Sequence, residues 1–191
     1  MENIILEGIA TSGKSTVQNH LETDLSDKGH LLKLISEKET LMPLLHNTDC
    51  KISIEFLKEL YNKYDSERKV NELFLFDRFY FTHIFRTQSS VQDFQEFENI
   101  LKHQSLTVLL TIQEDQILDR IHLARSHRSQ QWNDYVSSKG SDSQIAMYYI
   151  TQQRILLDIC KESVVPYIVV DTTDMNFKQV MDTIQLRLKM S

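Results

Sequence analysis

The sequence predicts an α/β fold of three layers, in which a five-stranded parallel sheet carries helices on both faces. Five short apolar runs lie along the chain, and a helical pattern of apolar residues follows each of them. Most of these runs are continuous rather than alternating, which is typical of strands buried on both faces. The chain also has only four glycines and two prolines among 191 residues, which disfavours an all-β fold with many tight turns.

The expected elements alternate along the whole chain. Strands are expected at the apolar runs, which cover residues 4–6, 31–35, 73–76, 106–112 and 167–170. Helices are expected where apolar residues recur at three- and four-residue intervals, at residues 17–25, 57–64, 94–101, 117–124, 145–159 and 177–188. This alternation implies right-handed crossovers and a layered domain.

The chain is predicted to form a single domain over residues 1–191. Its length is sufficient for one core of ordinary size, and no repeat or low-complexity linker divides it. The most polar stretch, residues 126–143, is expected to be a mobile insertion between two helices.

The bulk composition favours a cytoplasmic protein. Its formal net charge is −6 and its isoelectric point is near 5.6, which argues against a general nucleic-acid binder. Cys50 and Cys160 lack the spacing of a zinc site or a disulfide framework. No apolar run has the length of a membrane span, and the first residues lack the basic segment of a signal peptide.

Residues 8–15 match the pattern GxxxxGK[ST], between an expected strand and an expected helix. In such a loop, backbone N–H groups and the N-terminus of the following helix surround a phosphate. Gly8 and Gly13 permit backbone conformations and close approaches that a Cβ atom hinders. Lys14 is expected to contact the β- and γ-phosphates, and the Ser15 hydroxyl to ligate Mg²⁺. The expected phosphate-binding residues are Gly8, Ile9, Ala10, Thr11, Ser12, Gly13, Lys14, Ser15 and Thr16.

Charged residues follow two of the expected strands. Asp77 and Arg78 come directly after residues 73–76, which places them beside the phosphate loop at the carboxyl edge of the sheet. Asp77 is expected to hold Mg²⁺ through water or to act as a base, and Arg78 to bind a second phosphate or a 5′-oxygen. Glu37 is the preferred carboxylate facing a phosphoryl acceptor, with Glu39 as the alternative. Residues of this kind also occur as helix caps and solvated loops.

A basic segment follows the fourth expected strand. Arg120, Arg125 and Arg128 lie within nine residues, next to the polar stretch. They suit a helical lid over residues 120–143, whose closure would bring guanidinium groups onto a transferring phosphoryl group and exclude water. On one continuous helix these three arginines would spread over about 140°, so not all of them need face one ligand. A solvated basic helix face is the alternative.

The chain resembles the thymidylate kinase and deoxynucleoside kinase group of P-loop enzymes in the order and spacing of five segments. These are residues 6–16, 35–43, Asp77-Arg78-Phe79 with Thr82, residues 107–128 and residues 169–172. The resemblance implies ATP and Mg²⁺ as cofactors, and it places Asp171 in the loop that approaches adenine. It also suggests a homodimer, for which the aromatic segment 79–97 would supply a face unless that segment is a buried core helix.

The chain departs from this group at positions that contact the acceptor. Thymidylate kinases usually have Asp-Gly where this sequence has Ala10 and Thr11. The glutamine expected after the Asp-Arg motif falls on Thr87, and deoxynucleoside kinases usually have Glu in place of Asp77. These departures leave the acceptor open between a nucleoside and a nucleoside monophosphate.

The function expected from these observations is ATP- and Mg²⁺-dependent transfer of a phosphoryl group to a nucleoside or nucleoside monophosphate, as in thymidylate kinase. The alternatives are a nucleotide-binding protein that keeps the phosphate loop without kinase activity, and a kinase of another small molecule. A GTP-hydrolysing switch is disfavoured because the sequence has no guanine-specifying NKxD motif.

Overall fold

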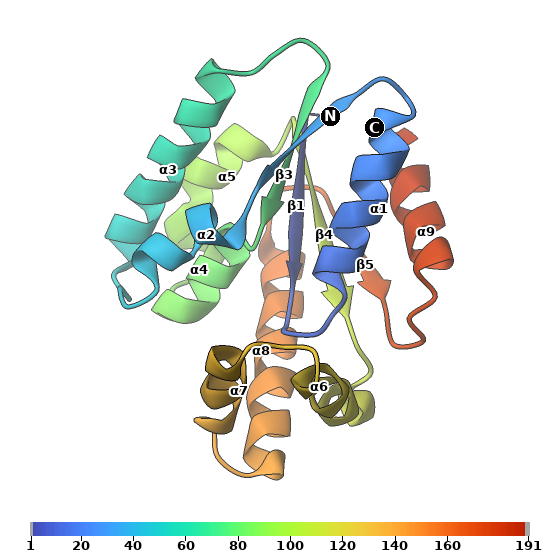
Figure 1. The fold of residues 1–191 in the computed structure, drawn as a ribbon. Helices are drawn as coiled ribbons and strands as arrows, with labels where there is room; N and C mark the ends of the chain where they lie inside the picture. Colours follow the sequence, from blue (N-terminus) through green and yellow to red (C-terminus); the bar gives the residue numbers. More distant parts are fainter. Residues whose placement is uncertain (1, 190–191) are drawn as a thin grey trace.

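The computed structural model describes residues 2–189, and over this range a single five-stranded parallel sheet forms the centre of the molecule (Figure 1). The strand order is β2-β3-β1-β4-β5. The predicted strands are confirmed as β1 (Asn3–Gly8), β2 (Leu31–Ile35), β3 (Glu72–Asp77), β4 (Ser105–Thr111) and β5 (Tyr167–Asp171). The central residues of β1, β3 and β4 are buried because helices cover the sheet on both sides, whereas the edge strands β2 and β5 keep exposed positions such as Leu34 and Val169.

Helices lie on both faces of the sheet, so the predicted three-layer α/β fold is confirmed. One face packs against α1 (Lys14–Ser26) and α9 (Phe177–Lys189). The apolar residues of these two helices contact the side chains that β1 and β4 direct to this face. The opposite face packs against four helices, as Figure 1 shows. They are α3 (Cys50–Ser66), α4 (Tyr80–Thr87), α5 (Gln95–Leu101) and α8 (Asp142–Glu162).

The aromatic segment between β3 and β4 is part of the core rather than a surface for a second subunit. Phe79, Tyr80, Phe81, Phe94 and Phe97 are all completely buried. Their rings contact one another edge-on or stacked, and the segment folds into α4, a 3₁₀ turn and α5. The buried-helix interpretation of this segment is therefore the one that the structure supports.

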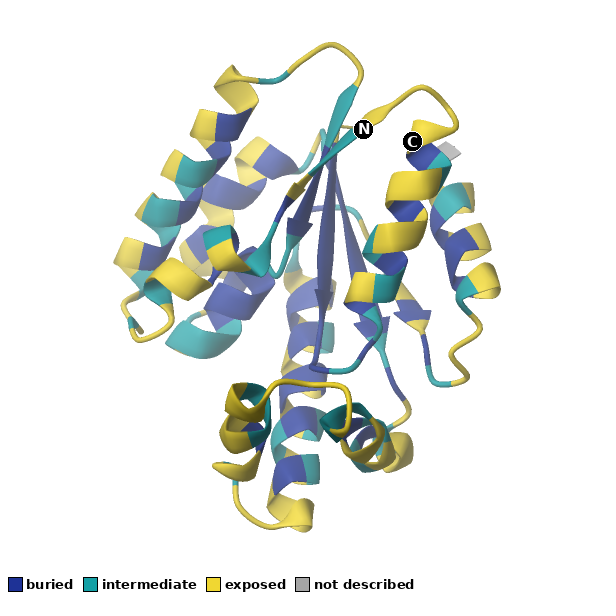
Figure 2. Cartoon of the chain, viewed as in Figure 1, coloured by how far each residue is buried: buried dark blue, intermediate teal, exposed yellow. Residues whose placement is uncertain are grey.

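The polar stretch after β4, which its composition predicts to be a mobile insertion, contains a short helix. After α6 (Ile117–Arg125), the short helix α7 (Gln130–Ser137) begins at Ser129, whose hydroxyl accepts a hydrogen bond from the N–H of Trp132. Val136 anchors α7 in the core. Figure 2 shows that most of the remaining surface of α7 is exposed, below the carboxyl ends of the strands.

The strand register gathers the functional loops at one edge of the sheet. Leu6 pairs with Asp77 and Gly8 pairs with Leu110, so the ends of β1, β3 and β4 lie side by side. The short helix α2 (Glu37–Thr40) follows β2 at the same edge, where the hydroxyl of Thr40 donates to the carbonyl of Asp77 (2.7 Å).

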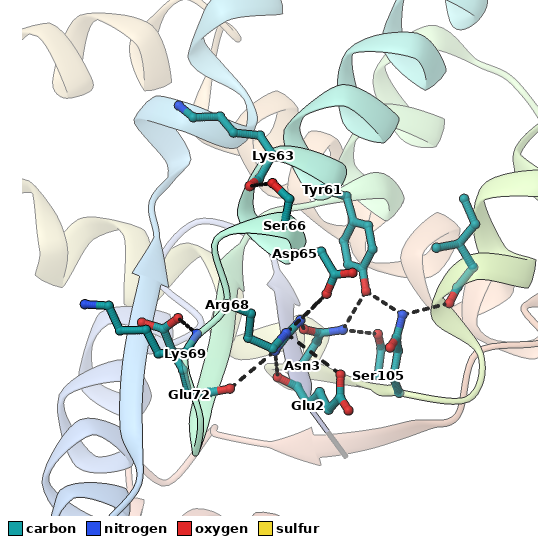
Figure 3. Close-up of polar contacts among 12 residues, drawn as sticks. Glu2, Asn3, Tyr61, Lys63, Asp65, Ser66, Arg68, Lys69, Glu72 and Ser105 are labelled. Atoms are coloured by element: carbon teal, nitrogen blue, oxygen red, sulfur yellow. Dashed lines mark hydrogen bonds and ion pairs between the residues drawn. The ribbon is translucent and has the colours of Figure 1, made fainter.

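The opposite edge of the sheet is closed by a polar network centred on Arg68 (Figure 3). Its guanidinium donates to the side chains of Asn3 (2.8 Å) and Asp65 (3.0 Å), and it lies 3.8 Å from the centre of the Phe74 ring. Asn3 in turn donates to the hydroxyl of Ser105 (3.1 Å). Since these groups satisfy one another, the network has a structural role and joins β1 to α3 and β4.

The structure bears on the membrane span and on the two cysteines considered in the sequence. Among residues 2–189, no helix combines the length and the apolar character needed to cross a bilayer. Cys50 and Cys160 are both free, and burial raises the pKa of the Cys160 thiol to about 12, so this thiol is protonated at neutral pH.

Replacing Phe97 with alanine should lower the free energy of unfolding by about 3–5 kcal/mol, because the ring fills the centre of the aromatic core. Ile100→Ala on the same helix is the matched control, since Ile100 is 39% exposed, and it should cost less than about 1 kcal/mol. Urea denaturation followed by circular dichroism measures both. Equal losses in the two variants would contradict the assignment of α5 to the core.

Candidate active site

The phosphate loop connects β1 to α1, and its lysine is held over the loop. Lys14 is buried, and its ammonium group donates to the carbonyls of Gly8 (3.0 Å) and Ile9 (3.1 Å). Burial is the main cause that lowers the pKa of Lys14 to about 8, and the positive charge of Arg78 lowers it further, while Asp77 and Glu37 act in the opposite direction. A bound phosphate would supply the negative charge that this buried cation lacks.

The two glycines of the loop occupy positions where a side chain does not fit. A Cβ atom on Gly8 would lie 2.6 Å from the carbonyl oxygen of Leu110, and one on Gly13 would lie 2.7 Å from the ring of Phe177. Gly13 also has a φ of 88° and is the N-cap of α1. Glycine at both positions lets the loop pass close to β4 and lets α1 begin directly behind it.

Thr11 adopts a left-handed backbone conformation although it is β-branched. Its φ is 67°, in the region where the resemblance would place a glycine. Its hydroxyl donates to the carbonyl of Ala10 (2.6 Å), and Arg120 donates to the carbonyl of Thr11 (2.8 Å). The loop therefore keeps a glycine-like path through local strain that these two contacts offset.

Glu7, the residue before the loop, holds the turn that follows β3. It is completely buried, and its carboxylate accepts hydrogen bonds from the N–H of Phe79 (2.8 Å) and the hydroxyl of Thr82 (2.6 Å). The N–H of Arg78 donates to the carbonyl of Leu6 (3.0 Å), and Arg78 has a φ of 52°. Because of these contacts, the turn at the end of β3 lies directly beside the phosphate loop.

Asp77, Arg78 and Glu37 are brought together at this turn. The guanidinium of Arg78 forms an ion pair with Glu37 (Nε–Oε2, 3.4 Å). Burial opposes the charge of Arg78, but the carboxylates of Glu37, Asp77 and Glu7 outweigh it and raise the pKa of Arg78. Asp77 Oδ1 is buried and has no hydrogen-bond partner among the described residues. Arg78 thus remains charged, and Asp77 presents a buried carboxylate oxygen to which no described residue donates a hydrogen bond.

The choice between the two glutamates of α2 is decided by helix capping. Glu39 closes a capping box with Ser36, accepting from its backbone N–H and its hydroxyl at 3.0 Å each, and the hydroxyl of Tyr64 also donates to it. Glu39 therefore serves the start of α2 and faces away from Arg78. Of the two, Glu37 is the one that lies at the site.

The three arginines predicted for the lid do not meet at one point. Arg120 is held by backbone carbonyls, donating to Thr172 (2.9 Å) as well as to Thr11. Arg125 reaches the hydroxyl of Ser137 (3.4 Å), and the guanidinium of Arg128 lies 5.7 Å from the ring of Trp132. Arg120 therefore connects the phosphate loop to the segment after β5, while Arg125 ends α6 and Arg128 lies in the turn between α6 and α7.

Asp171 ends β5, and its carboxylate is used in the turn that follows. It is exposed and accepts a hydrogen bond from the N–H of Thr173 (2.8 Å). A residue that sequence reasoning missed lies next to it, since the buried Thr172 donates its hydroxyl to the carbonyls of Ser12 and Thr111, each at 2.9 Å. Together with Arg120, Thr172 attaches the phosphate loop to the far side of the sheet.

Two further polar groups at this edge were not predicted. His83 on α4 is buried and donates from Nε2 to the carbonyl of Thr40 (2.8 Å) in its neutral form, because burial lowers its pKa to about 4. Its Nδ1 and the hydroxyl of Tyr149 on α8 are buried without a partner among the described residues. Burial raises the pKa of Tyr149 to about 12, although the nearby positive charge of Arg78 acts to lower it. In the sequence both residues look like ordinary members of a core stripe.

Comparison with known proteins places this arrangement among solved structures. No protein-family model matches the sequence, and no curated protein matches it. The YorR protein of Bacillus subtilis, solved in complex with phosphorylated GDP, has a TM-score of 0.64 at 15% identity, with 98% of each chain covered. Thymidylate kinase from Ehrlichia chaffeensis has a TM-score of 0.59 at 15% identity, covering 96% of this chain and 98% of its own.

Deoxyadenosine kinase from M. mycoides has a TM-score of 0.55 at 16% identity, covering 99% of this chain and 100% of its own. The chain has the fold of the P-loop nucleotide kinases. The motifs indicated a resemblance to thymidylate and deoxynucleoside kinases. The structural comparison extends this resemblance in fold over nearly the whole chain. At these identities the comparison shows the fold, and the chemistry has to be argued from the site.

Thr11→Gly should stabilise the protein by about 0.5–1 kcal/mol, because glycine adopts a positive φ without the cost that a β-branched residue incurs. The gain is reduced by the greater entropy of glycine in the unfolded chain. Thr16→Gly, in the first turn of α1, is the matched control and should destabilise the protein by roughly 0.3 kcal/mol, since glycine is a poorer helix former than threonine. Thermal unfolding compares the two, and changes of the same sign would contradict the strain at Thr11.

Proposed function

We propose that the protein is an ATP- and Mg²⁺-dependent phosphotransferase that acts on a nucleoside or nucleoside monophosphate, in the manner of thymidylate kinase. The observation that carries this proposal is the convergence of Lys14, Asp77 and Arg78 at one edge of the sheet, with Glu37 ion-paired to Arg78 at 3.4 Å. The nucleotide kinases that share the fold support the reaction class.

The phosphate loop would bind the donor. The backbone N–H groups of residues 8–16 and the N-terminus of α1 suit the β- and γ-phosphates of ATP. Lys14 would exchange its two carbonyl contacts for phosphate oxygens and neutralise charge that develops during transfer. Arg120 and Thr172 tie this loop to the segment around Asp171, where the adenine would lie.

Mg²⁺ would bind between the hydroxyl of Ser15 and the carboxylate of Asp77. The residues fit this ion, since both offer oxygen and Asp77 Oδ1 is a buried oxygen to which no residue within 2–189 donates a hydrogen bond. When bound there, the ion would supply positive charge to the β- and γ-phosphate oxygens. Asp77 stands at the end of β3, paired with Leu6 of β1, so this carboxylate is held at the base of the phosphate loop.

The acceptor would bind on the side of Arg78 and Glu37. The ion pair with Glu37 directs the guanidinium of Arg78 toward α2, which suits orientation of a phosphate or a 5′-oxygen. Arg125 and Arg128 would approach the transferring group when the helical segment 120–143 closes as a lid. The rate enhancement would come from position and charge rather than from covalent catalysis.

Lys14→Met should abolish ATP-dependent phosphoryl transfer while leaving the fold intact, because the lysine serves the ligand rather than the core. The measurement is ATP consumption against a panel of nucleosides, nucleoside monophosphates and other small hydroxyl compounds, with Mg²⁺ present. Lys51→Met, an exposed lysine on α3, is the matched control and should keep wild-type turnover.

The panel also separates the proposal from its rivals. Turnover with a nucleoside or nucleoside monophosphate supports it. Turnover only with another hydroxyl compound would show that the protein is a kinase of a different class of acceptor. ATP binding without transfer to any acceptor would indicate a nucleotide-binding protein instead. Full activity in Lys14→Met would show that residues 8–16 are not the donor site.

Binding of ATP should be accompanied by proton uptake near pH 8. The pKa of Lys14 in the free protein is lowered to about 8, and a bound triphosphate raises it by adding negative charge. At pH 8 about half of the free protein lacks this proton, so binding should take up about half a proton and should weaken at higher pH. Titration calorimetry in two buffers of different ionisation enthalpy measures the uptake.

Lys14→Arg is the control for this titration, because a guanidinium remains charged across this pH range. The proton uptake should vanish in this variant even where binding persists. The same uptake in both proteins would mean that another group is responsible.

A further inference from the structure

A groove of about 740 Å³ lies between α4 and α8. Its size is in the range of small-molecule sites, which is about 300–1,000 Å³. Phe85 and Arg86 line it from α4, Lys139 from the turn before α8, and Met147, Tyr148 and Ile155 from α8. The lining contains two cations and no carboxylate. This charge is unexpected in a protein whose formal net charge is −6.

Of the two terminal nitrogens of Arg86, one is hydrogen-bonded within the described residues and the other is not. Its Nη2 donates to the carbonyl of Leu44 (3.0 Å) and to that of Leu45, which fixes the guanidinium against the loop after α2. Its Nη1 is buried and has no hydrogen-bond partner, and no ion pair to Arg86 occurs among the described residues. A buried N–H of a cation without a partner is costly, so this group is suited to an anionic oxygen.

Lys139 is held at the same groove by two aromatic rings. Its ammonium group lies 4.1 Å from the centre of the Tyr135 ring and 4.6 Å from that of the Tyr148 ring. These contacts restrict the position of the lysine and leave its charge without a carboxylate partner. The groove therefore presents a second cation whose place is set before any ligand arrives.

The rest of the groove is apolar. Phe85 and Tyr148 meet edge to face at 6.4 Å between ring centres. Met147 is 59% exposed and Ile155 is 37% exposed, so apolar surface continues along α8 beside the two rings. Such a wall next to two cations suits a molecule that is apolar at one end and negatively charged at the other.

We infer that the groove between α4 and α8 binds a small anionic molecule with an aromatic or apolar body, and that Arg86 and Lys139 hold its anionic group. The anion is a carboxylate or a phosphate ester, either of which accepts from a guanidinium. The inference does not depend on the proposed kinase activity, because it rests on the groove alone. The molecule can come from two sources: the far end of the phosphoryl acceptor, or a separate ligand.

A matched pair of probes tests the site directly. 1-Naphthyl phosphate combines an aromatic body with an anion, while 1-naphthol has the same body without the charge. By titration calorimetry the phosphate should bind at one site and the naphthol at least about tenfold more weakly. Arg86→Gln and Lys139→Gln should each weaken the phosphate by about tenfold. Arg154→Gln, an exposed arginine on α8 paired with Glu114, is the control and should bind like the wild type.

Several outcomes would overturn the inference. One is equal binding of 1-naphthyl phosphate to wild type and to both groove variants. Another is loss of its binding in Lys14→Met, since the probe would then occupy the phosphate loop. A third is a wild-type dimer in light scattering that Met147→Glu dissociates, because the groove would then be covered by a second copy of the chain.

Kinetics distinguish the two sources of the molecule once the acceptor panel yields a substrate. If the groove holds the end of the acceptor, Arg86→Gln should raise the KM for the acceptor about tenfold with kcat unchanged. If it holds a separate ligand, the acceptor KM should stay unchanged while probe binding is lost. If the panel yields no substrate, the calorimetry alone decides the groove and the kinase proposal fails separately.

Discussion

The buried carboxylate of Glu7 is the contact on which the geometry of the site depends. It stands in β1 directly before the phosphate loop, and it accepts from the N–H of Phe79 and from the N–H and hydroxyl of Thr82. Burial raises the pKa of Glu7, and the hydrogen bonds act against that rise. A single side chain thus joins the strand that carries the donor loop to the turn that carries Asp77 and Arg78. Because the carboxylate is buried, the two parts of the site cannot separate without leaving polar groups unpaired.

Two residues with a strained backbone lie at the same edge of the sheet. Thr11 and Arg78 are both non-glycine residues in the left-handed region, where L-residues are disfavoured. In each case a contact from another element holds the strained residue, Arg120 at the carbonyl of Thr11 and Glu37 at the guanidinium of Arg78. Strain that the surroundings hold in place is typical of positions where a side chain or a backbone group must meet a ligand. The replacement of the usual glycine by Thr11 therefore alters the energy of the loop without altering its path.

The donor half of the site was predictable because it is local. Nine consecutive residues form the loop, and continuous apolar runs identify the strands of a parallel sheet on their own. The other half was not predictable, since it depends on tertiary contacts. The different roles of Glu37 and Glu39 become visible only in the capping box that Glu39 forms with Ser36. The role of Arg120 becomes visible only in the hydrogen bonds that it donates to carbonyls after β5. Helix α4 was expected only as one alternative for the aromatic segment 79–97, because its first residues are buried on nearly every side and the choice between core and surface depends on tertiary packing.

The same division explains why proteins with this fold differ in what they phosphorylate. The donor loop is set by one motif between a strand and a helix, whereas the proposed acceptor side draws on α2, α4 and α8, which lie far apart in the sequence. Substitutions there change the polar groups offered to an acceptor while the phosphate loop stays the same. In this chain three polar atoms of α4 and α8 are buried without partners among the described residues, namely His83 Nδ1, Arg86 Nη1 and the Tyr149 hydroxyl. A molecule that reached them would gain hydrogen bonds that the folded chain leaves unmade, so under the proposed kinase function the choice of acceptor would depend on unpaired groups of this kind rather than on the phosphate loop.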